Sequence, residues 1–286
     1  METKTSSLRW AIVLSLLLSV GKAIAGWFCS SASLFASALD SFMDVGISSA
    51  NYLAVRKASK PPDQDHAYGH EKIESLASYS QGIVILIFAF LIFGESLKRI
   101  VTKSFVSHSG LALGTIALAS LVNLFLVGIL HRAQKKTGSL ILKAEQAHYL
   151  TDIYSYLAIF VALLFVRLTG WPGWDFVGAV LLSGYVTFLA AEILKQAANE
   201  LVDRSLSRNA LDALDSIIRH HPQILDYHEI RTRKAGKKTF IDFHLVMKPN
   251  QSFERAHRIT ESLIEKIKSR FENADVTVHE DPEGGI

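Results

Sequence analysis

Apolar stretches of about 20 residues recur along most of this chain, and they limit its fold more than any other feature. A helix of about 20 apolar residues is long enough to cross the hydrocarbon core of a bilayer. We recognise six such stretches, at 9–28, 32–55, 76–98, 110–130, 141–167 and 174–199. Backbone polar groups find no water in lipid, so these spans must be helical and must pack against one another. The sequence predicts an all-α six-helix membrane bundle within residues 1–204.

The first stretch has a second interpretation. Its basic start, apolar core and small-residue end at Ala23–Ala25 resemble a cleaved signal peptide. However, Lys22 interrupts the region of cleavage, and cleavage would leave five spans with awkwardly placed charges. A first transmembrane helix is the favoured interpretation.

Residues 205–286 contain no such stretch and are rich in charged residues and histidine. Periodicity predicts helices at 208–220 and 251–270 and strands at 226–234, 239–247 and 274–279. This order predicts a small α+β domain of the ferredoxin-like, metallochaperone-like class. A domain of this size has one exposed sheet face, and an oligomeric partner would help to bury it.

Charges in the loops give an orientation. Cations are concentrated in the loop between spans two and three and in the loop between spans four and five, at Arg56, Lys57, Lys60, Lys72, Arg132, Lys135 and Lys136. The opposite side carries Lys98, Arg99, Lys103 and Arg167. The excess places both termini and the tail domain in the cytoplasm. The net charge of +3 is small, and we expect no nucleic-acid partner.

Two matched polar pairs interrupt the apolar helices. Asp40 and Asp44 lie in the second span, and His148 and Asp152 lie in the fifth. The i, i+4 spacing puts both members of a pair on one helix face. An Asp at the bilayer centre costs about 2.5–3.5 kcal/mol, so such residues are usually kept for function. If the pairs meet, they form a tetrahedral site for a divalent cation. The alternatives are hydrogen bonding between helices and a relay that carries only protons.

The types of ligand available limit which metal ion this site can bind. Cys29 is the only cysteine, so one chain has no thiolate site. One imidazole with three carboxylates favours Zn²⁺, Fe²⁺, Co²⁺ or Ni²⁺ over Cu⁺, and it disfavours Mn²⁺ and Mg²⁺.

Two further clusters lie outside the spans. The loop PPDQDHAYGHEKIES brings Asp63, His66 and His70 together if it is compact, although a solvated loop is an equal alternative. In the tail, His228, His244 and His257 lie on different elements, and His279-Glu280-Asp281 form the last group of adjacent potential ligands. Those residues form either a titratable solvent face or a metal site that stabilises a dimer.

These motifs together resemble the cation diffusion facilitator family, in its bacterial zinc and iron efflux branch. The resemblance rests on DSFMD, PPDQDHAYGHEKIES, HYLTD, LVDRSL and VHEDP in this order. It implies that the two pairs form the transport site and that the loop cluster is a second metal site. It also implies a binuclear tail site at a dimer interface, formed by His228, His244, His257, His279 and Asp281. Lys72 and Asp203 match an interhelix charge pair of that branch, and Glu280 replaces a residue that can be an amide in relatives.

The expected function is a proton-coupled antiporter that exports divalent metal, Zn²⁺ foremost and also Fe²⁺ or Cd²⁺, by alternating access. His148, Asp44 and Asp152 would couple the protons, and a divalent transition metal would be both substrate and structural or regulatory ion. The expected assembly is a homodimer in the bacterial inner membrane, acting on metal ions and protons without covalent chemistry and therefore not an enzyme. The rival is a membrane metal sensor or scaffold that moves no ion.

Overall fold

The computed structural model describes residues 2–28, 32–102, 110–171, 173–249 and 251–283, and it divides into two compact units, Met1–Ala197 and Ala198–Ile286. Cys29 and Lys103 lie outside the described residues. The boundary expected between residues 204 and 205 stays a prediction, and the two units are described separately below.

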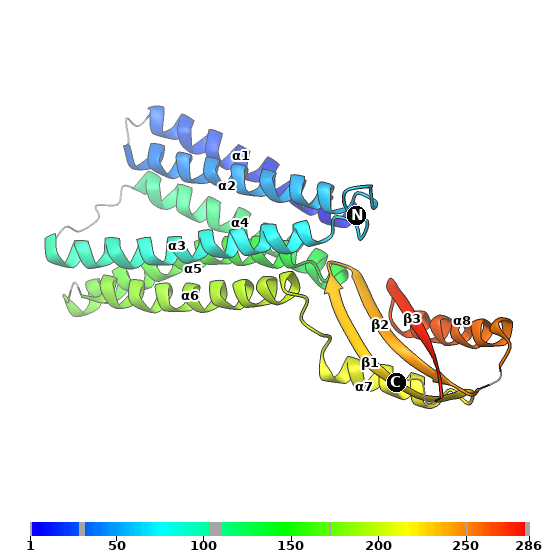
Figure 1. Ribbon diagram of the computed structural model, residues 1–286. Coiled ribbons are helices and arrows are strands. Elements are labelled where there is room, and N and C mark those ends of the chain that lie inside the picture. Colours follow the sequence, from blue (N-terminus) through cyan, green and yellow to red (C-terminus); the bar gives the residue numbers. More distant parts are fainter. Residues whose placement is uncertain (1, 29–31, 103–109, 172, 250, 284–286) are drawn as a thin grey trace. The chain divides into compact units, whose positions relative to one another are not determined.

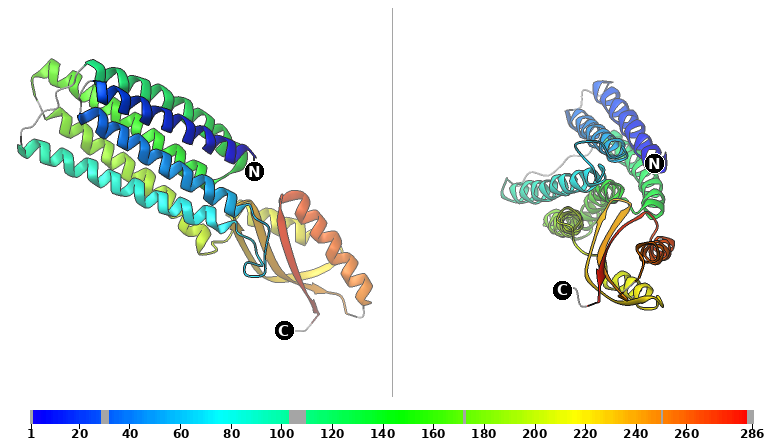
Figure 2. Two further views of the ribbon diagram at one scale, coloured as in Figure 1. Left: turned by 90° about the horizontal axis from the view of Figure 1, so that it is seen from above. Right: turned by 45° about the vertical axis from the view of Figure 1, so that its right-hand side comes forward.

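Long helices run side by side in the first unit (Figures 1 and 2). Their bounds are α1 Glu2–Phe28, α2 Ala32–Ala58, α3 Lys72–Thr102, α4 Gly110–Thr137, α5 Leu140–Thr169 and α6 Trp174–Leu201. Within the described residues, five of them are long and apolar enough to cross a membrane. The exception is α2, because Asp40, Asp44 and several serines lower its mean hydropathy. Helices stand at the places of all six expected spans, five of them with the expected apolar character, and most of them extend beyond the predicted ends.

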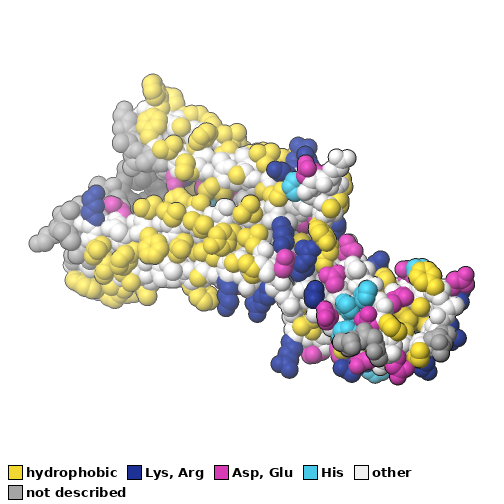
Figure 3. Space-filling view, in the orientation of Figure 1, with side chains coloured by type: hydrophobic (Ala, Val, Ile, Leu, Met, Phe, Trp, Pro, Cys, Tyr) yellow, Lys and Arg dark blue, Asp and Glu magenta, His cyan; other side chains and the backbone are white. Residues whose placement is uncertain are grey.

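Helix α5 is the centre of this unit, since it contributes to two separate apolar cores. Ile141, Leu142 and Tyr149 pack with residues of α1, α2 and α4. Ala144 and Ala147 pack with residues of α3 and α6. Apolar side chains cover the visible outer face of the helices (Figure 3). The polar half of α5 is therefore turned inward, as a helix in lipid requires.

Close approach of α3 and α6 depends on a glycine. A Cβ built on Gly82 would lie 2.9 Å from Cγ of Leu194, which is closer than real contacts allow. Small residues at such points let helices pack tightly in membranes.

The second unit is a three-stranded sheet covered on one face by two helices. Its elements are α7 Arg208–Arg219, β1 Ile224–Ala235, β2 Lys238–Met247, α8 Phe253–Arg270 and β3 Ala274–Pro282. The strand order is β1-β2-β3; β2 pairs antiparallel with β1 and parallel with β3. Apolar residues of α7 and α8 share one core with the inward side chains of β2. This confirms the expected small α+β domain.

Candidate metal centres

The first centre lies inside the helix bundle, where α2 meets α5. His148 Nε2 is 2.8 Å from Asp44 Oδ1, and His148 is buried. One ligand atom each of Asp44, His148 and Asp152 lies within 4.8 Å of the other two. The spacing fits a single ion, because metal–oxygen and metal–nitrogen bonds of about 2.0–2.2 Å separate neighbouring ligands by less than this distance.

Asp40 faces the same cavity but is not part of this close set. The cavity has a volume of about 240 Å³, and its polar wall includes Asp40, Asp44, His148 and Asp152. Phe88 and Ile92 of α3 belong to its apolar wall. A water molecule occupies about 30 Å³ in the liquid, so there is room for an ion with water ligands. The two predicted pairs therefore share one cavity, with three of the four side chains already clustered.

Thr151, Ser155 and Tyr156 also line the cavity, and none of them was predicted as part of the centre. Two further unpredicted polar residues lie beside it. Asn123 of α4 donates a hydrogen bond from Nδ2 to Asp152 Oδ2 at 3.3 Å. Lys22 of α1 is buried, and its ammonium interacts electrostatically with the aspartates of the centre. Each is an isolated polar residue in an apolar helix. The same pattern identified the aspartates in the sequence, so it could also have identified these two residues.

A second buried polar network lies one helical turn away on α5. The carboxylate of Glu145 is fully buried and accepts hydrogen bonds from Ser48, Asn51 and Gln81. Tyr149 shares a hydrogen bond of 3.0 Å with Ser48. These bonds join α2 and α3 to α5 and fix the helices that carry Asp44 and His148.

The second centre is the loop before α3. Asp63 Oδ1 lies 3.0 Å from His66 Nδ1, and Asp63 Oδ2 lies 3.2 Å from His70 Nε2. Residual burial opposes ionisation of Asp63, but hydrogen bonds from His66 and the nearby histidine charges outweigh it and lower its pKa. His70 Nδ1 is buried and has no hydrogen-bond partner among the described residues. The three side chains form a compact set with ligand atoms within 4.8 Å, as the sequence predicted.

The third centre lies on the sheet of the second unit, and strand register builds it. His228 pairs with His244 across β1 and β2, and His244 pairs with His279 across β2 and β3. Asp281 Oδ2 lies 2.9 Å from His244 Nδ1 and 3.4 Å from His228 Nε2, and Asp281 Oδ1 lies 3.4 Å from His279 Nε2. The hydrogen bond from His244 lowers the pKa of Asp281 against residual burial, and the neighbouring histidine charges add to it. Asp281 is thus kept ionised, as a metal ligand must be.

A β-bulge follows His228 directly. The register shifts between His228 and Arg231, and Glu229 has a φ of 53°. A bulge bends its strand and redirects the neighbouring side chains, and such bulges are common next to functional sites. Histidine side chains gather on the visible face of this unit (Figure 3).

The close tail set consists of His228, His244 and Asp281, and His279 contacts Asp281 without being part of that set. Three further implied residues are not gathered into these sets. His257 lies exposed on α8 and stacks on Phe253 at 6.3 Å between ring centroids, so its ligand role stays a prediction. Glu280 accepts a hydrogen bond of 2.6 Å from Thr260 of α8, which turns it away from the histidine row. Asp203 lies 3.5 Å from Arg233, and the Lys72–Asp203 pair, which would link the two units, stays a prediction.

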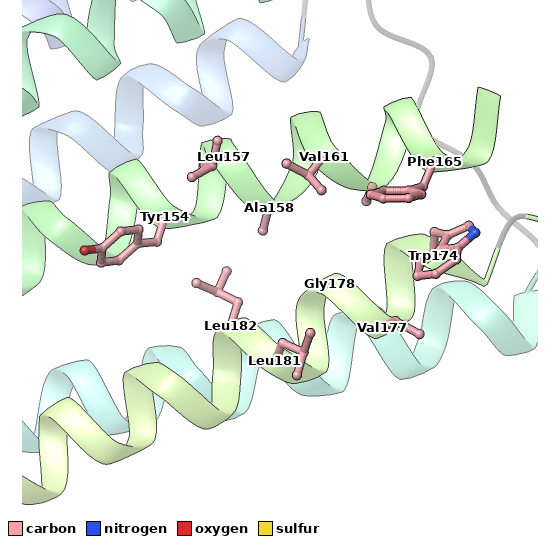
Figure 4. Close-up of a pocket in the computed structure, with 11 residues that line it drawn as sticks. Tyr154, Leu157, Ala158, Val161, Phe165, Trp174, Val177, Gly178, Leu181 and Leu182 are labelled. Carbon is pink, nitrogen blue, oxygen red and sulfur yellow. The ribbon is translucent and has the colours of Figure 1, made fainter. Parts of the chain in front are cut away.

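A larger cavity of about 370 Å³ lies between α5 and α6 (Figure 4). Its lining runs from Tyr154 at one end to Trp174 at the other, with aliphatic side chains and Phe165 between them. It offers almost no polar atoms, so it cannot hold a cation.

Helices of membrane-crossing length around a buried cluster of carboxylates and imidazole define a class of protein: a membrane transporter for cations. Comparison with known proteins supports this class. The family model described as "Cation efflux transmembrane domain" matches residues 8–202, and the model described as "Cation efflux protein, cytoplasmic domain" matches residues 206–283. The chain belongs to the cation efflux family, which is the cation diffusion facilitator family that its motifs resemble. The second match also supports homodimerisation.

Individual relatives cover nearly the whole chain. The cation-efflux pump FieF of Shewanella oneidensis is 35% identical over 274 residues, which is 96% of this chain and 92% of that protein. Protein p34 of Rickettsia prowazekii is 31% identical over 277 residues, which is 96% of this chain and 91% of that protein. The solved metal-bound C-terminal domain of the CzcD transporter from Thermotoga maritima is 25% identical, with a TM-score of 0.27, and the match covers 28% of this chain and 99% of that one.

Proposed function

We propose that this protein exports a divalent transition metal from the cytoplasm, Zn²⁺ foremost and also Fe²⁺ or Cd²⁺, in exchange for protons. The observation that carries the proposal is the buried set of Asp44, His148 and Asp152 in helices of membrane-crossing length, with Asp40 in the same cavity. Hard and borderline ligands of this kind suit a divalent ion that prefers nitrogen and oxygen.

The contact between Asp44 and His148 supports the proposed exchange for protons. His148 Nε2 and Asp44 Oδ1 are 2.8 Å apart, and without a metal ion this distance corresponds to a hydrogen bond that needs a proton on one of the two residues. A metal ion bound by both atoms must displace that proton, because ligands bind metals only when deprotonated. Protons that return from the outside would compete for the same atoms and release the ion. Asp152 would take part in the same competition.

The surrounding parts have roles that fit this cycle. The loop set of Asp63, His66 and His70 would hold metal near the cytoplasmic entrance. The tail set, with His257 as a further ligand, would bind metal as a structural or regulatory ion in a homodimer. In this proposal both termini lie in the cytoplasm, the protein lies in the bacterial inner membrane, and the bundle alternates between two openings.

A membrane sensor or scaffold that moves no ion is the rival. It gains nothing from carboxylates at membrane depth, where each one is costly. A flux measurement separates the two directly.

The test is Zn²⁺ flux into proteoliposomes under a pH gradient, for the wild type and Asp44→Ala. We expect Asp44→Ala to lose nearly all flux, because it removes a ligand of the close set. Asp275→Ala, an identical change at an exposed position of the tail, should keep wild-type flux. Equal flux in wild type and Asp44→Ala would refute the assignment.

A further inference from the structure

Lys22 is a buried cation in a transmembrane helix. Its side chain is only 5% exposed, and Nζ donates hydrogen bonds to Ser41 Oγ at 2.8 Å and to the Ser37 carbonyl at 3.4 Å, both on α2. Removing an ammonium from water costs several kcal/mol, so some nearby negative charge must compensate it. The neutral oxygens of Ser41 and Ser37 do not supply that charge.

A second buried lysine has its charge compensated by a direct ion pair. Lys4 forms a direct ion pair with the carboxylate of Glu74. Within the described residues, Lys22 has no such direct partner, and its charge interacts instead with Asp40, Asp44 and Asp152. Ser41, its closest contact, is the neighbour of Asp40 in sequence. The ammonium is therefore held beside the metal centre without occupying it.

Over the four residues of the centre, with Glu145 left in its own hydrogen-bonded network, the charges balance only when Lys22 is counted. Three ionised carboxylates carry three negative charges, and a divalent ion supplies two positive ones. The ammonium of Lys22 supplies the third. A net charge inside a bilayer is strongly unfavourable, so a neutral loaded site is the favourable state in which to change conformation.

We propose that Lys22 is a resident countercharge that matches the centre to divalent ions and limits their affinity, so that the ion can be released. It acts through charge and is not a ligand. This inference rests on the proposed function. Without Lys22 the empty centre would be more negative, the ion would bind more tightly and it would leave more slowly.

The test measures Zn²⁺ affinity and maximal transport rate of the full-length protein carrying Asp63→Ala and His244→Ala, which disable the loop and tail sites. In this background we expect Lys22→Gln to bind Zn²⁺ at least about fivefold more tightly, the lower end of typical coupling between sites. The maximal rate should fall. Lys22→Arg, which keeps the charge, should stay near the wild-type values.

Two controls separate charge from packing. Lys143→Gln removes an ammonium that pairs with Glu192 at 2.7 Å, away from the centre, and should change neither affinity nor rate. Ser41→Ala removes the hydrogen bond but leaves the charge, and should bind as the wild type does. Unchanged or weaker binding in folded Lys22→Gln would overturn the inference, as would tighter binding in Ser41→Ala.

If Lys22→Gln does not fold, adding Asp40→Asn should restore folding, because it removes one of the excess negative charges. Failure to restore it would also overturn the inference. The proposed function fails separately, if the wild type and Asp44→Ala bind Zn²⁺ equally in this background.

Discussion

Asp152 shows how one residue of the candidate centre depends on a neighbour outside the close set. Asn123 Nδ2 reaches Asp152 Oδ2 from α4 and so restricts the orientation of the carboxylate. Partners that orient a metal ligand typically contribute 10–100-fold to metal affinity.

Removing that partner gives a prediction at the residue scale. Asn123→Ala should weaken Zn²⁺ binding at the bundle centre by about tenfold, measured by titration of the purified protein with the loop and tail sites disabled. Asn209→Ala, the same change at an exposed position of α7, is the matched control and should bind normally. Equal affinity in both variants would mean that Asn123 does not orient Asp152.

The residues of the centre differ in how far the sequence could predict them. Asp44 and the pair of His148 and Asp152 were predictable, because i, i+4 spacing is a local property of a helix. That Asp44 lies nearer His148 than Asp40 does is set by the packing of α2 on α5, which no local pattern contains. Asn123 was visible as a lone polar residue in an apolar helix, but its partner on α5 was not.

At the scale of elements, the tail centre depends on strand register. Alternation along 239–247 predicted which side chains share a face. It could not predict that His228, His244 and His279 stand in one row, because register comes from pairing between strands distant in sequence. The sequence could not predict the bulge at Glu229 either, because an extra residue in one strand leaves the alternating pattern of the partner strand unchanged.

The segment between α7 and β1 gives a pH prediction. His221 is buried, with no partner for Nδ1 among the described residues, and burial followed by the charge of Lys266 lowers its pKa below 6.5. The unfolded chain therefore takes up a proton that the folded domain refuses. Stability from this group is complete above about pH 6.5 and is lost as the pH falls through the lowered value.

Hydrogen exchange of α7 in the full-length protein, corrected for intrinsic rates, measures this effect. Between about pH 7 and pH 5 the wild type should lose more protection than His221→Leu, which has no group to protonate at this position. The same loss in both proteins would show that His221 does not cause it.

At the scale of the whole molecule, the sequence predicted the division into long apolar helices and a small α+β tail because hydropathy and alternation report burial directly. Helix α2 is the informative exception. The aspartates that lower its hydropathy are the same residues that line the cavity, so the least apolar helix carries half of the candidate metal centre. Charged residues that the function needs within the membrane thus lower the hydropathy by which a membrane-spanning helix is recognised.

We infer that this centre exchanges a divalent metal for protons. The most direct measurement starts from proteoliposomes with equal Zn²⁺ on both sides and an acidic interior. We expect the wild type to accumulate Zn²⁺ inside as protons leave. An agent that collapses the pH gradient should abolish the accumulation, and Asp44→Ala should show none. Wild-type vesicles that stay at equal Zn²⁺ while the gradient persists would contradict it.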